Sequence, residues 1–185
     1  MMMYLSKGMI VPPDANPVFR VCRWGKIHAL GPEAAELWRR GCTGPAAASE
    51  EELTAVRRLA DAGLLSTTEE TGRLAAFRLL NDCVLCPSGK RPRLLWGRER
   101  RIWTWLTRTG LRLTSSELIR LEERRITPVP ELLGESGRQA LTEEIYTNAN
   151  IFDGVLETEM EHSPARDATT AAVLRLVRKR CLLLI

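Results

Sequence analysis

Cysteine and histidine side chains are the first candidates for chemistry in this chain. The segment Cys83–Cys86 has the C-x-x-C spacing of zinc ligands and of redox disulfides. A zinc site needs two further ligands, but no second C-x-x-C and no C-x-x-H occurs, and His28 and His162 lie far apart. A redox pair normally opens a helix, whereas this one precedes Pro87. We therefore interpret the cysteines as structural and expect no metal and no cofactor.

No motif for a catalytic centre is present. The chain lacks G-x-S-x-G, a Walker loop and G-x-G-x-x-G, and neither histidine has a nucleophile in a known spacing. Acidic pairs such as Glu143-Glu144 fit a solvated helix face better than an active site. We therefore expect a protein without catalytic residues, one that binds or regulates a partner.

Composition favours a soluble protein of the cytoplasm. No pattern of a secretory signal is present, and the five cysteines are an odd number, so free thiols in a reducing compartment are expected. No apolar run is long enough to span a membrane, and Cys181–Ile185 is expected to be a short buried strand.

Charge is unevenly distributed along the second half of the chain. Between Lys90 and Arg125 lie eleven basic and four acidic side chains, with Trp96, Trp103 and Trp105 among them. Arginine suits bidentate contacts to phosphate or guanine, so this basic block favours nucleic acid. The alternative is that the tryptophans are core residues and the arginines form a solvated face.

An acidic stretch follows the basic block. Between Glu131 and Glu161 lie eight acidic side chains and one basic side chain. This stretch can dock on the basic block, within one chain or across a dimer. In that case the inference of nucleic-acid binding no longer holds.

The elements expected before the basic block are strands and helices in alternation. Val18–Trp24 and Ile27–Leu30 are expected to form a hairpin, and Pro32 to begin a helix that ends near Gly41. Ser49 and Glu52 have the spacing of a capping box for a second helix, which Gly63 ends.

Two strands joined by a turn are expected after that second helix. They are Leu64–Thr67 and Arg73–Leu80, and Glu69–Gly72 forms the turn between them.

The second half is expected to be mainly helical. Helices are predicted over Arg98–Thr109, from a capping box of Thr114 with Glu117, from Ser136, from Asn150, and over Asp167–Arg180. The sequence therefore predicts an α+β protein with three parts: residues 1–86 form one domain, residues 87–97 a basic linker, and residues 98–185 a second domain with a closing strand.

Ala62-Gly63-Leu64-Leu65, followed by the predicted turn, resembles the end of a winged-helix domain. There, glycine stops the recognition helix before the strand that leads into the wing. The middle helix of the usual three is missing or reduced to Cys42–Ala48. The second domain is expected to be either helical or a second winged helix. Glu69 and Glu70 at the wing tip disfavour an approach to phosphates.

Leu30–Trp38, followed by a helix and Gly63-Leu64-Leu65, is also similar to the small winged-helix domains of peptide-modification pathways. Those domains bind a leader peptide by adding it to a strand edge. This resemblance implies a peptide partner near the strand Val18–Trp24.

Two functional hypotheses follow. The first is a DNA-binding protein similar to transcription regulators, dimeric and binding double-stranded DNA. The alternative is a peptide- or protein-binding adaptor that uses a strand edge. The residues predicted to contact nucleic acid are Arg57, Arg58, Arg73, Lys90, Arg91, Arg93, Arg120, Arg124 and Arg125.

Overall fold

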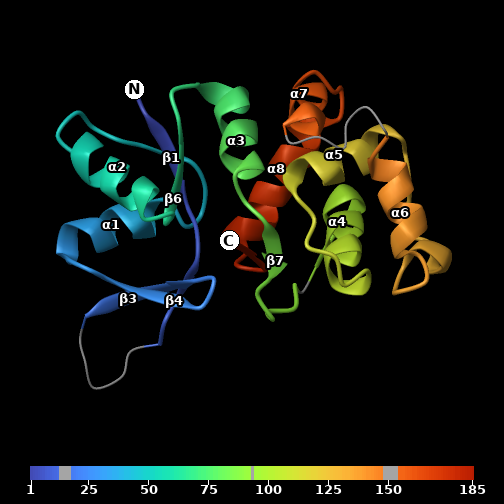
Figure 1. The fold of residues 1–185 in the computed structure, drawn as a ribbon, viewed down its shortest axis with the longest axis horizontal. Helices are drawn as coiled ribbons and strands as arrows, with labels where there is room; N and C mark the ends of the chain where they lie inside the picture. Colours follow the sequence, from blue (N-terminus) through green and yellow to red (C-terminus); the bar gives the residue numbers. More distant parts are fainter. Residues whose placement is uncertain (13–17, 93, 148–153) are drawn as a thin grey trace. The chain divides into compact units, whose positions relative to one another are not determined.

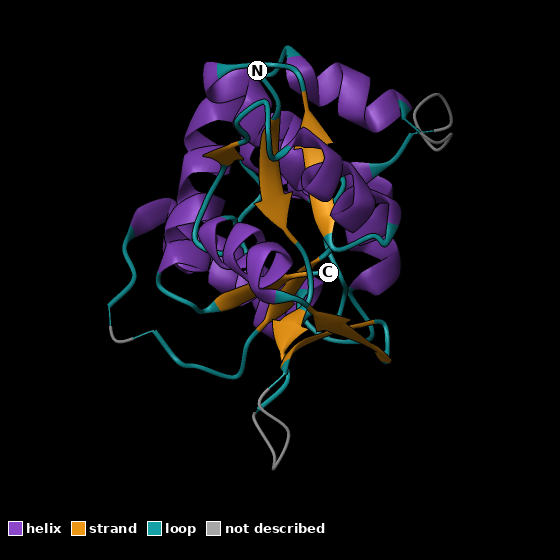
Figure 2. Cartoon of the chain, turned by 90° about the vertical axis from the view of Figure 1, so that its left-hand side faces the viewer, coloured by secondary structure: helices purple, strands orange, loops and turns teal. Residues whose placement is uncertain are grey.

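The computed structural model describes residues 1–12, 18–92, 94–147 and 154–185. The chain divides into two compact units. The first comprises Met1–Cys83 together with Leu183–Ile185, and the second comprises Val84–Leu182. The described residues form eight α-helices and small antiparallel sheets, so the fold is α+β, as the sequence predicted (Figures 1 and 2).

One sheet of the first unit is built around a strand that the sequence did not predict. Strand β1 (Met3–Ser6) lies between β5 (Ala46–Ala47) and β6 (Leu65–Thr68), antiparallel to both. Tyr4 and Leu5 on β1 are completely buried. The strand is too short for its period to be recognised in the sequence, and no turn residue precedes it.

The second sheet is an antiparallel meander of β2 (Met9–Ile10), β3 (Phe19–Arg23) and β4 (Lys26–Leu30). The predicted hairpin of Val18–Trp24 and Ile27–Leu30 is thereby confirmed.

Three helices complete the first unit: α1 (Pro32–Arg40), α2 (Leu53–Asp61) and α3 (Gly72–Asn81). The core of this unit consists of residues from α1, α2 and the sheets: Tyr4, Val21, Leu30, Ala35, Leu37, Trp38, Ala48, Val56, Leu59, Leu64 and Leu65. The predicted stop at Gly63 is confirmed. Gly63 has φ +75°, and the next N–H, of Leu64, donates back to the Leu59 carbonyl.

The strand predicted over Arg73–Leu80 is wrong, because these residues form helix α3. The segment has no β-branched residue and is rich in leucine, alanine and arginine, which are good helix formers. Ala75, Phe77, Leu79 and Leu80 are buried. A wing made of two strands after Gly63 is therefore not present, which removes one of the features behind the winged-helix resemblance.

The second unit is mainly helical. It contains α4 (Gly97–Arg108), α5 (Ser115–Glu123), α6 (Arg138–Ile145), α7 (Val155–Glu161) and α8 (Arg166–Arg178), with a short 3₁₀ helix at Pro130–Leu132 and the strand β7 (Leu85–Pro87). The last strand, β8 (Leu182–Leu184), spans the division between the units. Helix α5 packs against α6, α7 and α8, and six of its nine residues are buried.

The capping box of Thr114 with Glu117 is confirmed. The helix predicted from Ser136 begins at Arg138 without a side-chain cap. The predicted start at Asn150 lies outside the described residues. No helix among the described residues combines the length and the apolar character that a membrane span requires.

Candidate functional site

The sheet β2-β3-β4 has one covered face and one open face. Val21 and Leu30 lie on the covered face, in the core of the first unit. Side chains alternate along a strand, and directly opposed residues of an antiparallel pair point to the same side. Met9, Cys22 and Ile27 are opposite one another in the register. These three residues therefore lie on the other face, which we call the open face.

The open face is mostly apolar, and Arg20 is its charged residue. The side chain of Met9 is 46% exposed and that of Ile27 is 55% exposed. Ala29, opposite Arg20 in the next row, is also exposed. In an antiparallel sheet that has one face in solvent, that face normally carries polar residues. A contiguous apolar patch marks a surface that interacts with a partner.

The turn between β3 and β4 sets the register of this sheet. Trp24 and Gly25 both have positive φ, +50° and +79°, as in a two-residue type I′ turn. The closing pair of such a hairpin, here Arg23 and Lys26, is hydrogen-bonded. The following pair, Cys22 and Ile27, is then a non-hydrogen-bonded pair.

Strand β4 is an edge of the sheet. Within the described residues its only neighbour in the sheet is β3. In non-hydrogen-bonded pairs the backbone N–H and C=O groups point away from the partner strand. The alternation therefore places the backbone groups of Ile27 and Ala29 on the outer side of β4. The sequence predicted a peptide near the strand Val18–Trp24. In this sheet β3 lies between β2 and β4, so the two edges are β2, which has only two residues, and β4, which has five.

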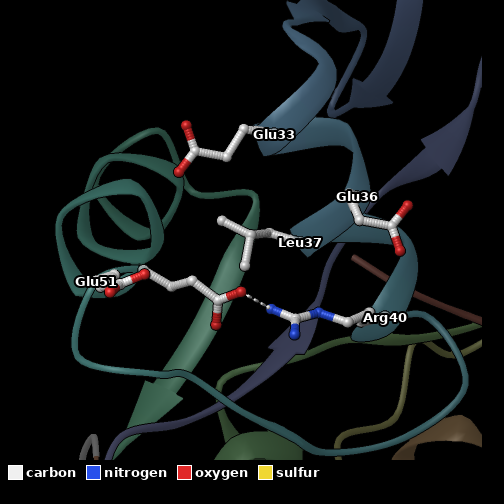
Figure 3. A pocket seen from close by; sticks show the side chains of 6 residues that line it. Glu33, Glu36, Leu37, Arg40 and Glu51 are labelled. Atoms are coloured by element: carbon white, nitrogen blue, oxygen red, sulfur yellow. Dashed lines mark hydrogen bonds and ion pairs between the residues drawn. The ribbon is translucent and has the colours of Figure 1, made fainter.

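A second feature of the first unit is an acidic pocket between α1 and α2 (Figure 3). It has a volume of about 400 Å³ and is lined by Glu33, Glu36, Leu37, Arg40, Glu51 and Glu52. Arg40 donates to Glu52 at 2.7 Å, and the Ser49 N–H donates to the same carboxylate at 2.9 Å. The Ser49 N–H, followed by Arg40, lowers the pKa of Glu52. Arg40 thus neutralises one carboxylate of this pocket.

The basic residues predicted to contact nucleic acid are dispersed over several elements. Arg57 and Arg58 are exposed on α2, and Arg73 is exposed in the first turn of α3. Lys90 and Arg91 are exposed in the loop before α4. Arg93 lies outside the described residues.

The last three predicted residues lie on α5 or just after it, and two of them are engaged by acidic helices of the same unit. Arg120 donates to Glu159 of α7 and, at 2.9 Å, to Glu123. Arg124 donates to the Glu144 carbonyl at the end of α6 at 2.7 Å. Part of the acidic stretch therefore docks on the basic block within one chain, which was one of the two arrangements foreseen for it. Contact of Arg120 with DNA would require these ion pairs to break.

Of the five cysteines, Cys83 and Cys181 are buried and the other three are half-buried. All five are free, and Cys83 is 2% exposed with its Sγ donating to the Leu79 carbonyl. Burial raises the pKa of Cys83 to about 12, so it carries almost no thiolate near neutral pH. In the part of the chain that the structure describes, no cluster of three or more histidine, cysteine or acidic side chains has an arrangement that could hold a metal ion.

Searches against family models, curated proteins and solved structures found no match to this chain. The open face was not predicted from the sequence, because the hairpin was interpreted only as a structural element. The signal was present in the apolar residues Ile27 and Ala29, which alternate with Lys26 and His28 along the predicted strand.

Proposed function

We propose that the chain is a peptide- or protein-binding adaptor, and that its first unit takes up an extended segment of a partner along β4. The observation that supports this most strongly is the apolar open face beside an edge strand. The ion pairs of Arg120 with Glu159 and of Arg124 with the Glu144 carboxylate favour this function over nucleic-acid binding, because they reduce the charge that a phosphate backbone would contact.

The chemistry of the partner follows from the edge. Ile27 and Ala29 each supply one outward N–H donor and one outward C=O acceptor, so an added strand gains main-chain hydrogen bonds whatever its sequence. The side chains of that strand alternate, and those on the open face lie across from Ile27 and Ala29. Apolar cross-strand pairs contribute roughly 0.2–1 kcal/mol each. The preferred segment is therefore extended, has apolar residues at every second position and lacks proline there.

The experiment begins with selection from a random dodecapeptide library displayed on phage. The peptide with the highest affinity is then added to the full chain labelled with ¹⁵N. We expect amide shifts at Ile27 and Ala29 that saturate with the peptide. Binding without any shift in β4 would contradict the proposal.

Two substitutions at one position isolate the main-chain contribution. Ala29→Pro removes the outward N–H but no ladder bond of the sheet, because proline is tolerated where the N–H faces solvent. Ala29→Thr keeps the N–H. Peptide affinity should fall about tenfold or more in the proline variant, which corresponds to about 1.4 kcal/mol, and remain close to wild type in the threonine variant. Equal affinities for both variants would exclude pairing along β4.

Duplex DNA is the second candidate partner, favoured by the exposed neighbours Arg57 and Arg58 on α2. With about five phosphate contacts, the slope of log K against log salt should be roughly −4 to −5. Binding to a random duplex, measured by fluorescence anisotropy at several salt concentrations, tests this. Weak binding with a flat slope would leave the peptide as the partner.

A further inference from the structure

The second unit contains a basic pocket that the proposed function does not use. It lies between the start of α4 and the end of α5, and its volume is about 340 Å³. The residues that line it are Arg98, Arg101, Glu122, Arg125, Ile126 and Thr127.

A buried carboxylate positions two of the arginines. The side chain of Glu122 is only 4% exposed. Arg101 donates to it through Nε at 2.8 Å and through Nη2 at 2.6 Å, and Arg98 donates through Nε at 2.7 Å. The fork of Arg101 is therefore held in plane, and the Arg98 guanidinium is fixed at one nitrogen.

These bonds leave donors available in the pocket. Within the described residues, Nη1 and Nη2 of Arg98 and Nη1 of Arg101 have no hydrogen-bond partner. The two side chains are 31% and 36% exposed, so these donors can reach a ligand from solvent. A guanidinium that is already held in place loses less conformational entropy when it binds an anion.

The third arginine comes from the end of α5. Arg125 is exposed and has φ +57°, the left-handed conformation that follows the last turn of a helix. Its N–H donates to the Glu122 carbonyl at 3.2 Å, which fixes the backbone from which its side chain extends.

The charges in the pocket do not balance. Three guanidinium groups face one carboxylate, which leaves two positive charges. The negative end of the α5 dipole and the positive end of the α4 dipole both lie at this pocket and oppose each other. The excess of positive charge therefore remains.

We propose that this pocket binds a phosphate group, either as inorganic phosphate or as a phosphomonoester on a small molecule. A phosphate dianion matches two positive charges and offers several oxygens to paired N–H donors, which arginine contacts in bidentate fashion. The pocket belongs to the second unit, so the proposal stands independently of peptide binding by the first.

The experiment is calorimetric titration of the full chain with inorganic phosphate, and in a second arm with phenyl phosphate. Tighter binding of phenyl phosphate would identify an ester as the ligand, and tighter binding of phosphate the free ion. Acetate at equal ionic strength serves as the reference anion. We expect phosphate to bind and acetate to bind at least about tenfold more weakly, because acetate carries one charge and two oxygens. Equal affinity for acetate, or no phosphate binding up to about 10 mM, would overturn the proposal.

A matched pair of variants separates the pocket from general electrostatics. Arg125→Asn removes one pocket donor at a position where asparagine tolerates positive φ, so the fold is retained. Arg100→Gln removes the same charge from an exposed position on α4 that does not line the pocket. Phosphate affinity should fall about tenfold in the first variant, the loss expected for one charge-assisted hydrogen bond, and stay within about twofold of wild type in the second. Equal losses in the two variants would refute a defined site.

Discussion

At the scale of single residues, Trp24 is the most unusual feature of the first unit. It has φ +50° in the β3–β4 turn, where glycine, asparagine and aspartate are the usual residues, and its side chain is 56% exposed. A large L-residue in this conformation costs roughly 1–2 kcal/mol. Strain retained at an exposed aromatic residue beside an apolar face favours a role in binding.

The first prediction concerns this strain. Trp24→Asn and Trp24→Ala both remove the indole ring, but only asparagine tolerates the left-handed conformation. We expect the free energy of unfolding of Trp24→Asn to exceed that of Trp24→Ala by about 1 kcal/mol in urea titrations. Both variants should bind the selected peptide more weakly than wild type. Equal stability of the two variants would mean that the turn carries no strain.

The second prediction concerns the thiols. Because burial raises the pKa of Cys83 to about 12 and the side chain is 2% exposed, Cys83 should resist alkylation in the native state. Iodoacetamide at pH 8 followed by peptide mass spectrometry measures this. Half-buried Cys22 on the open face should react faster than Cys83, and bound peptide should slow its reaction. Rapid labelling of Cys83 in the native state would contradict its burial in the first unit.

At the scale of elements, α4 and α5 are joined through Glu122. Burial alone would raise the pKa of this carboxyl, but the hydrogen bonds from Arg101 and Arg98 outweigh it, and the net shift is downward. A carboxyl whose pKa is lower in the folded state stabilises that state at pH above its unfolded pKa. This contribution to the free energy of unfolding is lost as the pH falls through the folded pKa of the carboxyl.

The third prediction follows from the lowered pKa of Glu122 in the folded state. Glu122→Gln should destabilise the second unit near neutral pH by roughly 1–3 kcal/mol, a moderate figure because the arginines are about one-third exposed. The difference from wild type should shrink as the pH falls below the ordinary pKa of glutamate and approaches the lowered pKa of Glu122 in the folded state. Urea unfolding between pH 3 and 7, monitored by hydrogen exchange of the helices of the second unit, tests both statements. A difference that does not change with pH would indicate that the charge of Glu122 is unimportant.

The elements also show what sequence patterns can and cannot predict. The stop at Gly63 and the capping box at Thr114 were predicted because each depends on local backbone chemistry within a few residues. The sequence of α3 predicts a strand as readily as a helix, because its apolar residues fit both periods over a short segment. Strand β1 was missed because its place at the centre of a sheet depends on partners more than forty residues away, such as Ala46.

At the scale of the whole molecule, residues brought together from distant segments could not be predicted from spacing. The sequence identified a basic block, but the contacts of Arg120 with Glu159 and of Arg98 with Glu122 depend on how the helices of the second unit pack. The first unit is likewise discontinuous, since it includes Leu183–Ile185. There the Gly8 N–H donates to the Leu184 carbonyl at 2.6 Å.

The last prediction tests the discontinuity of the first unit with two leucines of β8. Leu182 and Leu184 are equally buried, each 3% exposed, but they belong to the second and the first unit respectively. Replacing a buried leucine by alanine costs about 2–5 kcal/mol where it packs. In hydrogen exchange followed by mass spectrometry, Leu184→Ala should accelerate exchange in β1, around Tyr4. Leu182→Ala should instead accelerate exchange in the helices of the second unit.

The two variants serve as controls for each other, because they make the same chemical change two positions apart. Local opening exposes the amides of the unit that has lost its packing, and amides elsewhere keep their protection. If both substitutions accelerated exchange in the same segments, the division of the chain within β8 would be incorrect. If Leu184→Ala left β1 unchanged, the C-terminal residues would contribute nothing to the first unit. Separate responses would show that a strand more than 170 residues along the chain completes the unit that carries the open face.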